Sequence, residues 1–141
     1  MKSLQINHAA VWILAVLQQG VGAGWYGVFR SRWMQLLSKQ ALDFEQQSTF
    51  QAYFPYVVSF LGAVLSCYVL AWLFKRLNID NMRDGILVAA LIWLAFSFVQ
   101  LAQVDLFSLR SIELSFINGG NSFVDAVLCG AMLGAWKKYE E

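Results

Sequence analysis

One stretch near the end of the chain, residues 117–136, constrains the fold more than any other. It reads INGGNSFVDAVLCGAMLGAW, a nearly continuous apolar run with one carboxylate, Asp125, close to its middle. A helix of about 20 residues is about 30 Å long, which is the thickness of the hydrocarbon core of a bilayer. The run therefore predicts a helix that crosses a membrane.

The composition supports this interpretation. Hydrophobic residues make up 59% of the 141 residues and charged residues only 13%, whereas an ordinary soluble domain has about 25% charged residues. So few charges could not cover the surface of a soluble domain of this size. The net charge of +1 gives no indication of a nucleic-acid partner. We expect the lipid bilayer to be the main partner of the chain.

Three further apolar runs precede this stretch, at residues 6–29, 53–74 and 85–107. Each is long enough to cross a bilayer. Residues 30–51 alternate basic and apolar residues with helical spacing, which predicts an amphipathic helix lying on the membrane surface. The sequence therefore predicts one all-α domain over residues 1–141, an antiparallel four-helix transmembrane bundle with a surface helix in its first loop.

Four crossings place both termini on the same side of the membrane. Six of the ten Lys and Arg residues then lie on that side, at Lys2, Lys75, Arg76, Arg83, Lys137 and Lys138. The other four lie on the opposite side, at Arg30, Arg32, Lys39 and Arg110. Because cytoplasmic loops carry an excess of Lys and Arg, the distribution predicts a multi-pass protein with both termini in the cytoplasm.

Polar side chains inside the predicted helices form the first candidate site. Counting about 1.5 Å per residue places Asp125 at the level of Gln18 and Gln19. The same counting places Asn121 at the level of Gln100. The members of this predicted polar cluster are Asp125, Asn121, Asn118, Gln18, Gln19, Gln100 and Gln103.

Two interpretations of the polar cluster remain open. A carboxylate near the bilayer centre costs about 2.5–3.5 kcal/mol, so Asp125 should face the bundle interior, a partner chain or a water-filled cavity. In the structural interpretation, Asp125 and the amides join the helices by hydrogen bonds worth about 0.6 kcal/mol each. In the functional interpretation, Asp125 binds a proton or a cation in a permeation path.

His8 is the single histidine of the chain. It shares a helix face with Gln19, eleven residues later, so a proton relay from His8 toward Asp125 is one hypothesis. The alternative is a hydrogen-bonded anchor at the membrane boundary. One imidazole cannot assemble a histidine-based metal site, and we expect no metal and no cofactor.

Small residues recur every four positions in the first and last runs. Gly20 and Gly24 have this spacing, as do Ala126, Gly130 and Gly134. Such strips let helices approach closely, within the chain, in a homo-oligomer or against another membrane protein. The two cysteines, Cys67 and Cys129, lie in different apolar runs without a CxxC motif. We expect both to be inert packing residues.

Several short motifs resemble a known family. They are Asn7 early in the first run, GWYG at residues 24–27, Trp33, YVLAWLF at residues 68–74 and GAMLGAW at residues 130–136. Over residues 6–136 they resemble a bacterial family of small four-helix membrane proteins, catalogued as domain of unknown function 1761. The resemblance implies an integral protein of the bacterial inner (plasma) membrane and no known activity. Asn121 after Gly120 departs from the aromatic residue that the family pattern implies.

Two hypotheses about function follow. In the first, the chain acts without catalysis through helix association, as a homo-oligomer or an accessory subunit. In the second, it is a small proton- or cation-linked transporter or channel subunit that uses Asp125. A membrane enzyme comes third, because the sequence contains no recognisable nucleophile–base pair or metal-ligand set. We therefore expect the chain not to be an enzyme.

Overall fold

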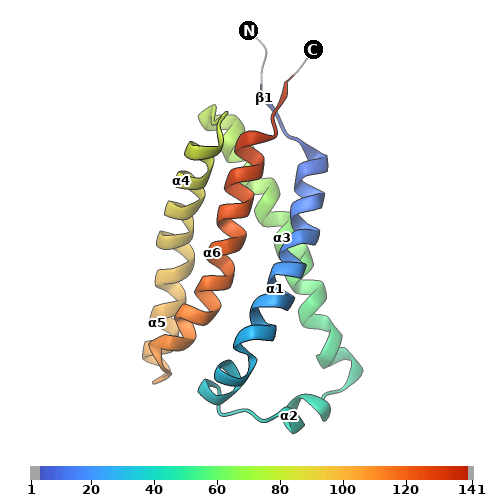
Figure 1. Ribbon diagram of the computed structural model, residues 1–141, viewed down its shortest axis with the longest axis vertical. Coiled ribbons are helices and arrows are strands. Elements are labelled where there is room, and N and C mark those ends of the chain that lie inside the picture. The colour runs from blue at the N-terminus through green and yellow to red at the C-terminus, as the bar shows by residue number, and fades with distance from the viewer. Residues whose placement is uncertain (1–3, 140–141) are drawn as a thin grey trace.

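The computed structural model describes residues 4–139, and helices make up most of them (Figure 1). The helices are α1 (His8–Leu36), α2 (Ala41–Glu45), α3 (Thr49–Leu77), α4 (Met82–Trp93), α5 (Val99–Phe107) and α6 (Ile112–Ala135). A π-helical turn, Leu94–Phe98, joins α4 and α5 into one continuous helix. Counted in this way, the described residues form five helices, which confirms the all-α prediction.

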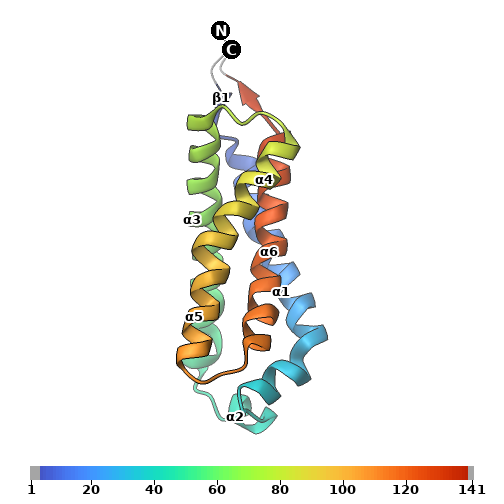
Figure 2. The same ribbon diagram turned by 90° about the vertical axis from the view of Figure 1, so that its left-hand side faces the viewer.

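The four long helices run up and down beside one another, with α2 at the end opposite the termini (Figures 1 and 2). The segments next to the termini pair as a short antiparallel ladder of β1 (Leu4–Gln5) and β2 (Lys138–Tyr139). Both ends of the described chain therefore lie at the same end of the bundle, as four antiparallel helices require. The most extensive contact between helices joins α4 to α6.

Three helices within the described residues are long and apolar enough to cross a membrane: Thr49–Leu77, Met82–Phe107 and Ile112–Ala135. They correspond to three of the four predicted crossings. Helix α1 has sufficient length but is not among the three. It contains the adjacent polar residues Gln18 and Gln19, which lower its hydropathy.

The predicted surface helix over residues 30–51 is wrong as a single element. Residues 30–36 continue α1, and Ser38, with φ of 55°, ends this helix because the left-handed region interrupts helical hydrogen bonding. Gln40 then opens the five-residue α2 with a capping box, and Ser48 opens α3 with another. The segment contains two helix starts, which the apolar spacing alone did not reveal.

Caps also explain why α4 and α6 start earlier than the apolar runs. The Ser111 side chain accepts a hydrogen bond from the backbone N–H of Glu113, so α6 begins at Ile112. Asn81 caps α4 in the same way, so this helix begins at Met82, three residues before Gly85. Polar residues at both positions satisfy free backbone N–H groups, and each helix gains about one turn.

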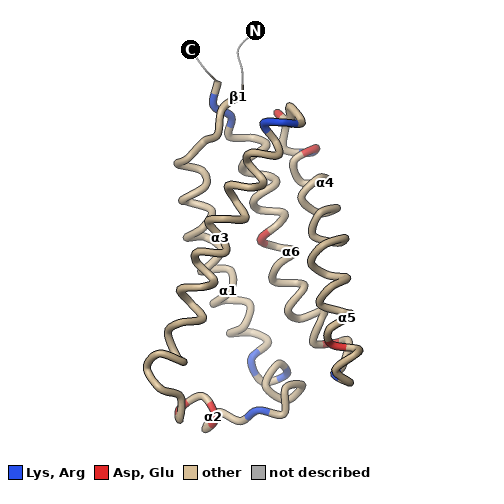
Figure 3. Tube along the Cα trace, turned by 180° about the vertical axis from the view of Figure 1, so that it is seen from behind, with Lys and Arg blue, Asp and Glu red and all other residues tan. Residues whose placement is uncertain are grey.

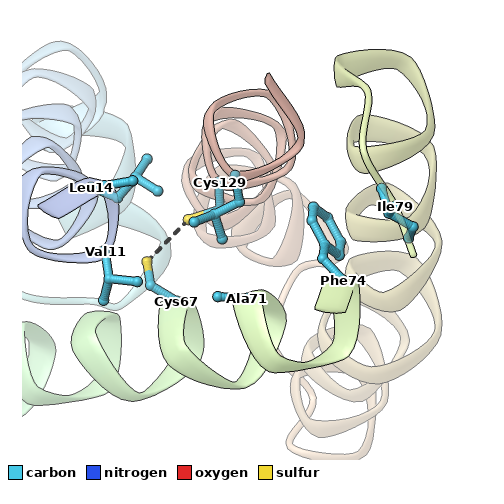
Figure 4. Packing of buried hydrophobic residues seen from close by; sticks show 9 residues of the cluster. Val11, Leu14, Cys67, Ala71, Phe74, Ile79 and Cys129 are labelled. Atoms are coloured by element: carbon cyan, nitrogen blue, oxygen red, sulfur yellow. Dashed lines mark hydrogen bonds between the residues drawn. The ribbon is translucent and has the colours of Figure 1, made fainter. Parts of the chain in front are cut away.

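The buried core lies where α1, α3 and α6 meet (Figure 4). Val11 and Leu14 of α1 are fully buried, as is Cys67 of α3. They pack with Cys129 of α6 and with Ala71, one turn after Cys67. Small and branched side chains alternate there, which allows three helices to share one narrow core.

The outer surface is unusually apolar. Large side chains such as Val28, Phe107 and Leu109 are 80%, 89% and 95% exposed. Apart from one acidic position midway along α6, acidic and basic residues gather instead at the two ends of the bundle (Figure 3). Soluble proteins rarely expose large apolar patches, whereas a lipid-facing surface requires them.

Candidate functional site

The candidate site centres on Asn121 and Asp125, which are four residues apart on α6 and therefore neighbours on one helix face. The Asn121 amide Nδ2 lies 3.5 Å from Asp125 Oδ2, at the limit of a hydrogen bond. Asn121 Oδ1 and Asp125 Oδ1 are both buried, and among residues 4–139 neither has a hydrogen-bond partner. Buried polar atoms without partners are rare in native proteins, so these two oxygens need an explanation.

The pair faces the interior of the bundle, toward α1 and α3. Asn121 Oδ1 lies 4.0 Å from the position that a Cβ at Gly22 of α1 would take. Cys129, one turn after Asp125 on the same face of α6, contacts Gln18 of α1 and Cys67 of α3. The glycine therefore allows the α1 backbone to approach Asn121 without a side chain between them.

Asn118 lies one turn before Asn121, and its side-chain oxygen has two donors. Its Oδ1 accepts hydrogen bonds from the Tyr26 hydroxyl at 2.8 Å and from Trp33 Nε1 at 3.1 Å. Trp25 Nε1 adds a 2.8 Å hydrogen bond to the carbonyl oxygen of Ile117. These contacts join α1 to α6, so Asn118 has the structural role of a clasp. The sequence did not reveal its aromatic partners, because only the helix register brings them to this level.

Gln18 contacts sulfur rather than the carboxylate. Its amide Nε2 lies 3.2 Å from Cys67 Sγ and 2.9 Å from Cys129 Sγ. Because Cys129 follows Asp125 by one turn of α6, Gln18 lies close to the predicted depth. Gln19 turns toward α3, where its Oε1 accepts a hydrogen bond from the Ser59 hydroxyl at 3.2 Å.

The structure does not bring Gln100 and Gln103 to the pair. Both side chains are exposed on α5, whereas Trp93 Nε1 donates a 2.9 Å hydrogen bond to Ser122 Oγ at the level of Asn121. The predicted match between Gln100 and Asn121 is therefore wrong by more than one turn. Part of the error arises because α4 begins at Met82, before the apolar run on which the count was based.

His8 makes a local contact at the terminal end of the bundle. Its Nδ1 lies 3.0 Å from the Tyr68 hydroxyl, and its side chain is exposed. It precedes Gln18 by ten residues, about 15 Å along the α1 axis. The structure thus gives His8 an anchoring partner on α3, and the relay toward Asp125 stays a hypothesis.

The two small-residue strips have different surroundings. A Cβ at Gly134 would lie 2.5 Å from the Asn81 carbonyl oxygen, and one at Gly130 would collide with the backbone of Gly85. This strip of α6 is therefore used for contact with α4, and Ala126 one turn earlier is half-buried. In contrast, no heavy atom lies within 4 Å of a Cβ built at Gly20 or Gly24 of α1.

A second acidic residue, Asp105, lies at the end of the bundle opposite the chain termini, and both of its carboxyl oxygens have partners. Asp105 of α5 is only 3% exposed. It forms a 3.0 Å ion pair with Arg110 and accepts a 2.6 Å hydrogen bond from the Ser115 hydroxyl of α6. Glu113 pairs instead with Arg32 of α1, at 2.5 Å. Both ion pairs join elements at the predicted membrane boundary.

Within the part of the chain that the structure describes, no group of three or more His, Cys, Asp and Glu side chains could hold a metal ion. The site therefore offers acceptor oxygens, amide donors and two thiols. These groups suit two kinds of chemistry, the binding of a proton and the chemistry of thiols.

Comparison with known proteins supplies a family without an activity. No curated protein and no solved structure matches the chain. The model of a family described as "Protein of unknown function (DUF1761)" matches residues 9–134. This match covers most of the chain and confirms the resemblance seen in its motifs, so the chain belongs to the DUF1761 family.

Proposed function

We propose that the chain is a multi-pass protein of the bacterial inner membrane that crosses the bilayer four times, with both termini in the cytoplasm. Three of its helices have the length and composition of membrane spans. Helix α1 packs beside α3 and α6 within the same bundle, which supports a crossing at the same depth. Its exposed residues include Trp12, Ile13 and Val16, as a lipid-facing surface would need.

Inside this bundle, Asp125 and Asn121 bind a proton. The observation that carries the proposal is the pair of buried acceptor oxygens without a donor. A carboxylic acid and an amide can exchange two hydrogen bonds, so a proton on Asp125 Oδ1 can be donated to Asn121 Oδ1 and gives both oxygens a partner. A hard cation such as Ca²⁺ needs six to eight oxygen ligands, and two oxygens provide far fewer.

The proposed activity is proton-linked movement of an ion or small solute, as a transporter or channel subunit. Ionisable residues within membrane helices commonly mark proton relays and substrate pathways. Asp125 lies between helices, on the face of α6 toward α1 and α3. Protonation there would remove a charge from the bundle interior, and release of the proton would restore it. This alternation would link the proton to the conformation of the bundle.

Proton flux into liposomes tests this function. The purified chain would be reconstituted with an internal pH-sensitive dye, and a pH gradient would be imposed. We expect Asp125→Asn to reduce the flux at least about tenfold, because an amide cannot exchange the proton. Asp80→Asn, which removes an exposed carboxylate from the loop before α4, should leave the flux unchanged. Equal flux with Asp125→Asn and with the parent chain would contradict the proposal.

Association through α1 is a second candidate function. Gly20, Gly24 and Gly27 lie on one side of α1, with open space where each Cβ would stand. Glycines at this spacing allow close helix pairing in a bilayer, here with a second copy of the chain. This proposal concerns α1 alone, since α4 already covers the strip on α6.

The size of the protein in detergent tests association. We expect a dimer that Gly20→Leu and Gly24→Leu together convert to a monomer. Gly62→Leu is the matched control, because Gly62 on α3 also has no neighbour within 4 Å of its Cβ position. A dimer that survives the α1 substitutions, in protein of unchanged helix content, would exclude this face.

A further inference from the structure

The proposed functions leave the two cysteines unused. They are the only cysteines of the chain, and they come from α3 and α6, 62 residues apart in sequence. Their Sγ atoms lie 3.3 Å apart in the core (Figure 4). Cys67 is 0% and Cys129 4% exposed. Two thiols that meet across helices in this way can do more than fill space.

We propose that Cys67 and Cys129 form a reversible disulfide that links α3 to α6, with a lipid-soluble quinone as oxidant. The two S–H bonds break and one S–S bond forms. Two electrons and two protons pass to the quinone, which becomes a quinol, so atoms and charge balance. Reduction by a dithiol returns both thiols. This inference goes beyond proton binding at Asp125 and does not depend on it.

The geometry requires little movement. An S–S bond is about 2.05 Å long, so the sulfurs must approach by about 1.2 Å from their present separation of 3.3 Å. Ala71, one turn after Cys67, is a small neighbour in the same core. The approach needed is therefore small compared with the length of either side chain.

Gln18 prepares the pair for this chemistry. Its Nε2 lies 3.2 Å from Cys67 Sγ and 2.9 Å from Cys129 Sγ, so it can donate to the sulfur that loses its proton. The thiolate is the form that reacts. The amide N–H stabilises the negative charge on that sulfur, and the proton passes with the electrons to the quinone.

Burial determines the class of oxidant. Water-soluble ionic oxidants are poorly dissolved in an apolar core, whereas a quinone is a two-electron oxidant that dissolves in the bilayer. The pair lies among Val11, Leu14 and Ala71, side chains that exclude water. We therefore expect the folded protein in lipid to be oxidised by decylubiquinone.

A cleavage experiment detects the link. The full chain in liposomes is treated with decylubiquinone, remaining thiols are blocked under denaturing conditions, and cyanogen bromide cleaves after methionine. Met82 lies between the two cysteines, so they fall on separate fragments, residues 35–82 and 83–132. We expect these fragments to migrate together without reductant and apart with it. The uncleaved chain should migrate as a monomer on the same gel. Its measured mass should be lower by about 2 Da, the two hydrogens lost on oxidation.

A matched variant tests the geometry. Ser66 is exposed and adjacent to Cys67, so the double change Cys67→Ala and Ser66→Cys moves the thiol to another side of α3. We expect no linked fragments from this variant and one quinol per chain from the parent. Blocking of both parent thiols after treatment would overturn the proposal. A disulfide found only between two copies of the chain would overturn it as well.

Discussion

The two sides of α6 are built differently. Toward α4 and α5, the small and polar groups of α6 have partners. Gly130 packs on the backbone of Gly85. Ser122 accepts a hydrogen bond from Trp93, and Ser115 donates one to Asp105. Backbone approach and paired polar groups together produce the most extensive helix contact of the described chain. This side of α6 is a structural contact.

Toward α1 and α3, α6 leaves polar groups without partners. Asn121 Oδ1 and Asp125 Oδ1 are buried and unsatisfied within the described residues, although Asn118 on the same face has two donors. The contrast teaches that burial alone does not define a role for a carboxyl group. Asp105 is buried with a cation and a hydroxyl as partners, whereas Asp125 is half-buried and its buried Oδ1 has no partner among the described residues.

Gly130→Leu gives the largest expected effect, because it places a large side chain in the close contact between α6 and α4. A side chain there would enter the space of the Gly85 carbonyl group and of Ala89. We expect the free energy of unfolding to fall by more than about 3 kcal/mol, beyond the usual cost of overpacking. Denaturation in detergent micelles measures it. Gly62→Leu on the open surface should not lower it, because leucine forms helices better than glycine, and equal losses would contradict the difference in packing.

Asp105→Asn gives an intermediate effect. It removes the charge that pairs with Arg110 and weakens the hydrogen bond from Ser115. Because Arg110 is 39% exposed, solvent replaces part of the lost interaction, and we expect a loss of about 1–2 kcal/mol. The same denaturation experiment measures it. Asp80→Asn, at an exposed carboxylate, serves as the control. If Asp105→Asn lost no more free energy of unfolding than Asp80→Asn, Asp105 would have no structural role.

Asp125→Asn gives the smallest effect on stability. Asparagine keeps the size of the side chain and adds an amide donor near the free Asn121 oxygen, so we expect a change below about 0.5 kcal/mol. The comparison with Asp105→Asn separates the two interpretations of the carboxyl group. A loss as large as that of Asp105→Asn would show that Asp125 is a structural clasp.

The four long helices could be predicted from the sequence, because the length of an apolar run needs only the rise of a helix. Caps shifted the boundaries: Asn81 started α4 early and displaced Gln100 from the level of Asn121. The break near Ser38 depends on local hydrogen bonds in a polar segment. Hydrophobic periodicity does not report such bonds.

The partners of the site residues could not be predicted, because they depend on the rotation of each helix about its axis. A rotation of one residue, about 100°, would move Cys67 away from Cys129. It would likewise separate Gln18 from both sulfurs. Only the packed bundle shows that α4 covers Gly130 and Gly134 while Gly20 and Gly24 stay open.

Infrared spectroscopy of the reconstituted protein tests the central claim, that Asp125 holds a proton inside the bundle. At neutral pH, we predict a carbonyl stretching band of a protonated carboxylic acid that Asp125→Asn removes and Asp105→Asn leaves in place. A parent spectrum without this band, or one that Asp125→Asn does not change, would contradict the account.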